Sequence, residues 1–172
     1  VSNQDIGFLI PHTRNTSFWI RNSIGQSLGD RNSGLSQFYF GGFRNNYIDW
    51  QPSEQYRNAL AFPGAKIDEI AAYNYIKTMG ELNLRPLRLR NVGASWLYPT
   101  FIKSSLFGTH LMTNFDKQSE LSHIFNVGGQ MDIQLVLFSY LKTTWSFGYA
   151  KKIENGQKGT NQFMLSLKLL GD

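Results

Sequence analysis

The sequence predicts an all-β fold: an antiparallel transmembrane β-barrel with about eight strands in this chain and one long extracellular loop. Three observations predict it. Apolar and polar residues alternate from Met131 to Leu170, turn-forming residues separate the alternating segments, and each segment has the length of a barrel strand. Because consecutive side chains on a strand point to opposite faces, each segment carries one apolar face and one mostly small or polar face.

The alternation assigns residues to each face. A barrel in a membrane turns its apolar set to lipid, whereas a soluble sheet buries that set under a second layer. The residues expected to face lipid are Met131, Ile133, Leu135, Leu137, Trp145, Phe147, Tyr149, Phe163, Leu165, Leu167 and Leu169. Which medium these side chains meet decides what the chain is.

Turn chemistry and spacing place the strands along the chain. The expected strands lie near residues 5–11, 16–28, 35–43, 74–86, 100–113, 123–140, 142–152 and 161–170. Between them runs the long loop 44–73, in which 65–75 is the one helix candidate. Long loops of outer-membrane barrels face outward and short turns face the periplasm, so the turn at 139–142 is expected on the inner side.

Aromatic residues gather near both ends of the expected strands, as amphipathic rings do at the two interfaces of a bilayer. The rings expected at the periplasmic rim are Trp96, Tyr98, Tyr140 and Trp145. Those expected at the outer rim are Phe115, Phe125, Tyr149 and Phe163.

The composition fits a wall that needs little charge outside. Aromatic residues make up 15% and charged residues 17% of the 172 residues, against about 25% charged in ordinary soluble chains. The net charge of +5 is scattered without a basic helix or stacking motif, so no nucleic-acid partner is expected. There is no cysteine, and no apolar run long enough for a transmembrane helix, which leaves a membrane-spanning β-barrel open.

Three segments resemble the C-terminal half of a BamA/TamA-type, bacterial surface-antigen barrel. They are GELNLRPLRLRNVG (80–93), NVGGQMDIQLVLFSYLKTTWSFGYAKKI (126–153) and NQFMLSLKLL (161–170). The nearest branch is the one in which the barrel follows a periplasmic, TolB-like propeller region. The resemblance covers about residues 35–170. It implies a Gram-negative outer-membrane protein that aids protein insertion or export, or that anchors a periplasmic domain.

The resemblance to a C-terminal half, together with a start at Val1, favours a part of a larger barrel over a complete small one. The remaining strands, or other chains of an outer-membrane complex, are then expected partners. Outer-membrane lipid and lipopolysaccharide are the others. For lipopolysaccharide phosphates the candidate contacts are Lys151, Lys152 and Lys158, although a merely solvated cluster is the more usual explanation of such a group.

In this family the loop corresponding to 44–73 folds back into the lumen and presents an Arg-Gly pair. Here Gly64 is present, but Pro63 stands where the resemblance expects arginine. Arg44 or Arg57 is the candidate replacement cation. The candidates for its acidic partner inside the barrel are Glu81 and Asp132, which both lie on the polar parity of their strands. Alternatively, lumen water simply solvates these two carboxylates.

Catalytic and metal-binding patterns are weak. Ser27 lies in a G-x-S-x-G sequence, but a turn follows it where a hydrolase would begin a helix. His12, His110 and His123 show no metal-ligand spacing along the chain. We therefore expect no enzyme, no metal and no cofactor.

The sequence thus predicts the structural wall of an outer-membrane barrel. One alternative is a soluble, lipocalin-like calyx that holds an apolar ligand and stays in solution without detergent. The other is a membrane-embedded hydrolase with Ser27 as its nucleophile.

Overall fold

The computed structural model describes residues 1–13, 15–29, 33–44, 53–89, 92–94, 96–154 and 159–170. These residues form strands and two single-turn 3-10 helices, and neither of these helices is long or apolar enough to cross a membrane. The elements are β1 (Ser2–Leu9), β2 (Ser17–Gln26), η1 (Gly34–Ser36), β3 (Phe38–Phe40), η2 (Gln55–Arg57), β4 (Ile70–Ala72), β5 (Asn74–Asn83), β6 (Leu87–Arg88), β7 (Leu97–Thr113), β8 (Ser122–Leu137), β9 (Leu141–Glu154) and β10 (Asn161–Leu170).

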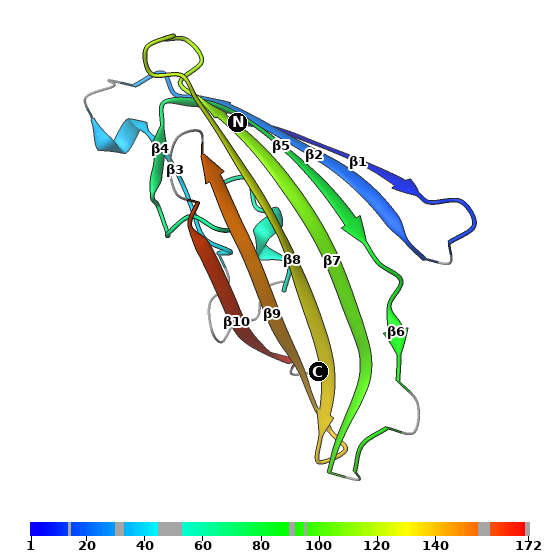
Figure 1. Cartoon of the computed structure of the whole chain (residues 1–172). Coiled ribbons are helices and arrows are strands. Elements are labelled where there is room, and N and C mark those ends of the chain that lie inside the picture. Colours follow the sequence, from blue (N-terminus) through cyan, green and yellow to red (C-terminus); the bar gives the residue numbers. More distant parts are fainter. Residues whose placement is uncertain are drawn as a thin grey trace.

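Eight strands form one antiparallel main sheet, which confirms the predicted all-β, antiparallel fold. Its order is β1-β2-β5-β7-β8-β9-β10, and β6 pairs with β7 where β5 has ended. Figure 1 shows this sheet as a long, curved and open surface. The sheet does not close into a barrel, because the described parts of β1 and β10 pair only with β2 and β9. Each therefore has one free edge.

The turn between β8 and β9 lies at residues 138–140, close to its expected position. Phe138 and Ser139 both adopt positive φ, at 51° and 67°, and Tyr140 N–H donates to the Leu137 carbonyl. Left-handed residues match the twist of the strands that such a tight turn connects. The expected Asn155-Gly156 turn and the centre of the Gly29–Gly34 turn lie outside the described residues.

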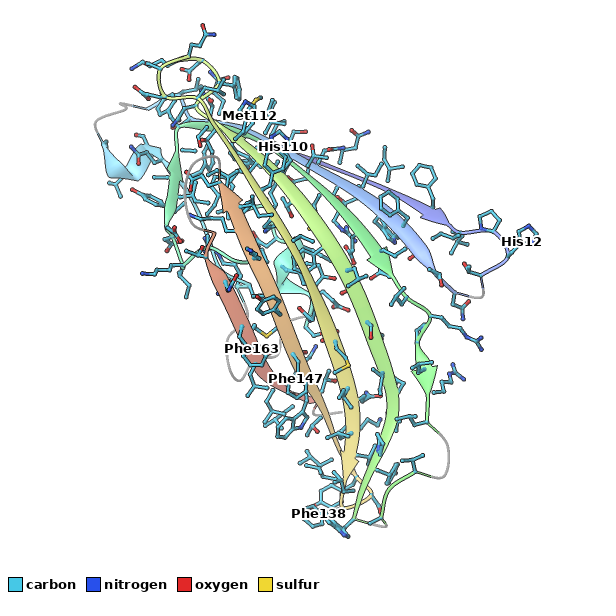
Figure 2. All side chains as sticks on the ribbon, in the orientation of Figure 1. His12, His110, Met112, Phe138, Phe147 and Phe163 are labelled. Carbon is cyan, nitrogen blue, oxygen red and sulfur yellow. The ribbon has the colours of Figure 1, made fainter. Side chains whose placement is uncertain are left out.

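Burial in the main sheet is the reverse of that in a soluble sheet. On β5, β7, β8 and β9 the buried parity carries most of the polar groups, among them Lys77, Glu81, Asn126 and Asp132. None of the eleven residues expected to face lipid is buried. We call these two sides the covered face and the apolar face. In Figure 2, Phe147 and Phe163 mark the apolar face on β9 and β10.

The covered face lies under the inserted segment, residues 27–73, which connects β2 to β5. Within it β3 and β4 pair only with each other, and they lie to one side of the main sheet (Figure 1). Two small apolar clusters join it to the sheet: Phe40, Phe62, Ala65, Ile70, Ala72, Tyr75, Leu111 and Ile124; and Phe43, Tyr56, Met79, Phe107, Ala150 and Met164.

Two predicted elements are wrong. The wall strand expected at 35–43 is only the three-residue β3 of the inserted segment, because Phe40 and Phe43 are buried in the clusters that hold this segment to the sheet. The helix candidate at 65–75 is extended: β4 covers Ile70–Ala72, and β5 begins at Asn74. Within this stretch Ile67 and Ala71 are exposed, whereas Ile70 and Ala72 pack in the cluster with Tyr75 and Leu111.

Two strand glycines on opposite faces give a matched test of this packing. A Cβ on Gly128 would lie 2.7 Å from the Tyr149 carbonyl and 2.8 Å from the Phe107 ring, whereas the nearest atom to a Cβ on Gly108 is 3.6 Å away. We expect Gly128→Ala to lower the free energy of unfolding by about 1–3 kcal/mol, the usual cost of overpacking. Gly108→Ala should change it by less than about 0.5 kcal/mol. Equal effects in denaturant titrations would contradict this assignment of faces.

Candidate functional site on the covered face

An ionic cluster around Glu81 joins the inserted segment to the main sheet. Glu81 lies on β5 and is 0% exposed. Arg57, in η2 of the inserted segment, donates to it from Nη2 at 2.5 Å and from Nε at 3.0 and 3.1 Å. Arg21 on β2 donates from Nε at 2.9 Å and also binds Asp5 on β1. The carboxylate thus has two cationic partners, as a buried charge requires.

Tyr56 completes the cluster from the inserted segment. Its hydroxyl lies 3.1 Å from Glu81 Oε1 and 2.8 Å from Ser105 Oγ, and its ring stacks on Phe107 at 4.6 Å between centroids. Burial, followed by the negative charge of Glu81, holds the pKa of Tyr56 above its usual value. Burial alone would lower the pKa of Arg57, but the hydrogen bond to Glu81, together with the nearby Tyr56, Glu81 and Glu54 charges, raises it above its usual value. Both residues therefore keep their donor protons.

Lys77 holds the adjacent turn of the inserted segment. This lysine lies on β5, two residues before Met79, and is buried on the covered face. Its Nζ donates to the carbonyls of Asn58, Ala59 and Ala61 at 2.8, 3.2 and 2.5 Å. Three carbonyls converging on one ammonium replace its lost hydration and fix the path of the backbone between η2 and Phe62.

A second set of contacts joins the segment to β8, β9 and β10. Gly64 has φ +96°, and a Cβ there would lie 2.5 Å from the backbone nitrogen of Lys152 on β9. Only glycine permits both this conformation and this close approach. Gly64 N–H donates to Gln162 Oε1 at 3.0 Å, and Thr160 Oγ1 donates to the Gly64 carbonyl at 2.6 Å. Asn126 on β8 donates to the neighbouring Pro63 carbonyl.

Glu69 makes the third attachment. Its carboxylate accepts from Lys152 Nζ at 2.6 Å, and Lys152 also contacts Glu154 at 3.3 Å. Burial raises the pKa of Glu69, but the hydrogen bonds from Lys152 and from the Lys66 N–H, together with the charges of both lysines, hold the pKa below its usual value. The Lys152 side chain is only 7% exposed.

The structure brings together some of the expected site residues and separates others. Arg57 and Glu81 are in contact, and Gly64 lies at the second attachment. Arg44 lies elsewhere and donates to Asp68 Oδ1 at 2.8 Å and to the Tyr39 carbonyl. Asp132 is buried beneath Ser53, with Gln130 Nε2 donating to it at 2.8 Å and Ser53 Oγ at 3.3 Å, so it is no partner of Arg44 or Arg57.

The expected cluster of three lysines is corrected. Lys151 is exposed on the apolar face, whereas Lys152 points to the covered face and binds Glu69 there. The reason is strand parity, since neighbours on β9 point to opposite sides. Lys158 lies outside the described residues. Among the described lysines of this cluster, only Lys151 therefore lies on the apolar face.

Sequence reasoning missed Arg21, Tyr56 and Lys77. For Lys77 a signal was present, because it shares the parity of Glu81 on the same strand. Arg21 and Tyr56 carried none, since their roles depend on which strand pairs with β5 and on how the inserted segment folds back.

The covered face is built for attachment more than for chemistry. Ser27 Oγ accepts from Gly29 N–H at 3.3 Å, and in the described residues the first helical turn after the serine is η1, a single turn that begins at Gly34. Among the described residues, no three His, Asp or Glu side chains are grouped to hold a metal ion. A cavity of about 470 Å³ opens beside the ionic cluster and is lined by Asp5, Arg21, Arg57 and Lys77, among other residues.

Comparisons with protein-family models, with curated proteins and with solved structures found no match to this chain. Its function is therefore inferred from the residues and contacts described above.

Removing the acidic centre should release the inserted segment. We expect Glu81→Ala to lower the free energy of unfolding by about 3–5 kcal/mol, because it leaves Arg57 and Arg21 without their shared partner. Arg44→Gln removes the half-exposed pair with Asp68 and should cost no more than about 1 kcal/mol. Limited proteolysis within residues 53–72 reports release. Equal protection in the two variants would show that Glu81 does not hold the segment.

Acid should weaken the third attachment. The pKa of Glu69 is lower in the folded chain than in the unfolded chain, so its stabilising contribution is complete above the unfolded value of about 4.3. That contribution disappears as the pH falls through the lowered folded value. We expect Glu69→Gln to remove this part of the acid dependence of unfolding while leaving the curve above neutral pH parallel to that of the native chain. An unchanged acid limb would contradict the role of Glu69.

Proposed function

We propose that this chain is the membrane-embedded wall of an outer-membrane β-barrel of the BamA/TamA type, with the inserted segment as a plug on the lumen side. The observation that carries the proposal is the reversed burial. The apolar parity of β7 to β10 is uncovered, while Glu81, Lys77 and Asp132 lie under protein. Lipid is the medium in which an uncovered face of this composition is stable.

The soluble calyx fits this arrangement poorly. A calyx needs the apolar parity inside and a charged exterior, but here Phe163, Tyr149 and Leu165 are 67, 53 and 42% exposed. An exposed apolar surface that spans several strands marks contact with a partner or a membrane. The rings of Tyr140, Trp96 and Trp145, expected at the periplasmic rim, are exposed as well, which suits an interfacial girdle.

Strand direction supports a wall that is completed by further strands. Each strand on the path from β1 to β10 is antiparallel to its neighbour, and the path holds seven strands, so β1 and β10 run in the same direction. Joining these two edges directly would pair them in parallel. Single-chain bacterial barrels have an even number of antiparallel strands. The partner that closes this wall therefore supplies an odd number of strands, and pairs its own edges antiparallel to β1 and β10.

The plug is fastened, in this proposal, by Arg57 and Glu81 where the resemblance expects an Arg-Gly pair. The role of the whole barrel, by the same resemblance, is to aid protein insertion or export or to anchor a periplasmic domain. Localisation in the outer membrane of a Gram-negative cell follows from the same inference. Lys151 remains the candidate contact for lipopolysaccharide.

Charge substitutions at two depths on β9 distinguish membrane from water. Both Phe147 and Ile153 lie on the apolar face, Phe147 in the middle of the strand and Ile153 beside its outer end. In a bilayer, Phe147→Arg should cost about 2–4 kcal/mol and Ile153→Arg about 0–1 kcal/mol. The measurement is the free energy of unfolding in lipid vesicles. If this face met water instead, arginine at either position would change the free energy of unfolding by no more than about 0.5 kcal/mol. A soluble calyx would enclose both side chains with its ligand, and it would stay in solution without detergent.

The hydrolase alternative has a direct test. Ser27→Ala should leave both folding and any esterase background unchanged, measured with a short-chain nitrophenyl ester on the refolded protein. Loss of ester hydrolysis in this variant alone would favour the hydrolase.

A further inference from the structure

Two histidines from neighbouring strands meet on the apolar face. His110 on β7 and His123 on β8 lie 3.1 Å apart, measured between Nε2 and Nδ1. Their ring planes are nearly parallel, at 5°, and Phe125 stacks on His110 with 4.5 Å between centroids. The pair lies near the outer ends of both strands, since β7 ends at Thr113 and β8 begins at Ser122.

The separation of the two nitrogens suits a shared metal ion. Transition metals bind imidazole nitrogen at about 2.0–2.1 Å, so two imidazoles in neighbouring coordination positions have nitrogens about 3 Å apart. Without metal the facing nitrogens share one proton. Metal binding moves that proton, through solvent, to the other nitrogen of its ring, and each facing nitrogen then donates a lone pair. Both rings remain neutral, and small side-chain rotations aim the lone pairs at the ion.

A third donor lies beside the pair. Met112 is the register partner of His123 in the β7–β8 ladder. It shares the parity of His110 and is half-buried, whereas Leu111 and Thr113 on either side are buried on the covered face. In Figure 2, Met112 and His110 lie together at the upper end of β7, far from His12 in the turn between β1 and β2. A thioether beside two imidazoles favours copper, and Cu⁺ in particular.

We propose that His110, His123 and Met112 bind one copper ion at the outer end of β7 and β8. The cross-strand pairing of His110 and His123 carries the proposal, and Phe125 holds the His110 ring in place. The site lies outside the inserted segment and does not depend on the ionic cluster around Glu81. It also stands independently of whether the apolar face meets lipid.

The test is metal binding by the full chain, folded in detergent micelles and prepared without a polyhistidine tag. Cu⁺, kept reduced with ascorbate, is titrated in competition with bicinchoninate, and Ni²⁺ is titrated separately. The native chain should bind one Cu⁺. His123→Gln should bind Cu⁺ at least about tenfold more weakly, because loss of a ligand costs no less than loss of a supporting contact. Met112→Leu should weaken Cu⁺ binding and leave Ni²⁺ binding unchanged.

His12→Gln is the matched control, since it removes a histidine outside the site and should leave both metals bound as before. Circular dichroism and heat-modifiable migration verify that each variant is folded. Native-like Cu⁺ affinity in the double variant His110→Gln/His123→Gln would overturn the site. Native-like Cu⁺ affinity in Met112→Leu would overturn the three-ligand arrangement.

Discussion

The rest of the structure depends on one constraint: the charged groups buried on the covered face need partners, and the inserted segment supplies many of them. Glu81 and Lys77 are almost fully buried, and an unpaired buried charge costs several kcal/mol. Arg57 and Tyr56 bind Glu81, and the carbonyls of residues 58–61 bind Lys77. The polar parity of the sheet and the fold of the segment therefore require each other.

Period-two alternation predicted the long strands because packing on both faces of the main sheet obeys it. β8, β9 and β10 lie within a few residues of their expected bounds. The same signal failed at 35–43, since an apolar, aromatic stretch has the same local appearance in a wall strand and in a folded insertion. What distinguishes the two is the pairing partner, and β3 pairs with β4 at long range instead of with β2. β6 was missed because it is only two residues long. It pairs with β7 beyond the point where β5 ends.

The site shows the same division between local and long-range information. Strand parity was enough to predict Glu81 as a site residue. It would also have placed Lys152 on the covered face, because Lys152 shares the parity of Ser146 and Ala150 on β9. Because these lysines are close in sequence, a cluster on the outer side was expected. On a strand, however, neighbouring side chains point to opposite faces. His110 and His123 are thirteen residues apart, a spacing with no meaning along one chain. Their meeting follows from the β7–β8 register, which sequence alone did not supply.

The attachments of the inserted segment also explain how an open sheet keeps one curvature. Arg57 reaches the Glu81 carboxylate that Arg21 of β2 also binds, while Gly64 binds Gln162 of β10. One segment thus contacts β5, the third strand in the order of the sheet, and β10, its last. A sheet with two free edges twists and bends easily when nothing spans it. Because the segment is anchored on both sides, its packing restrains the sheet between β5 and β10.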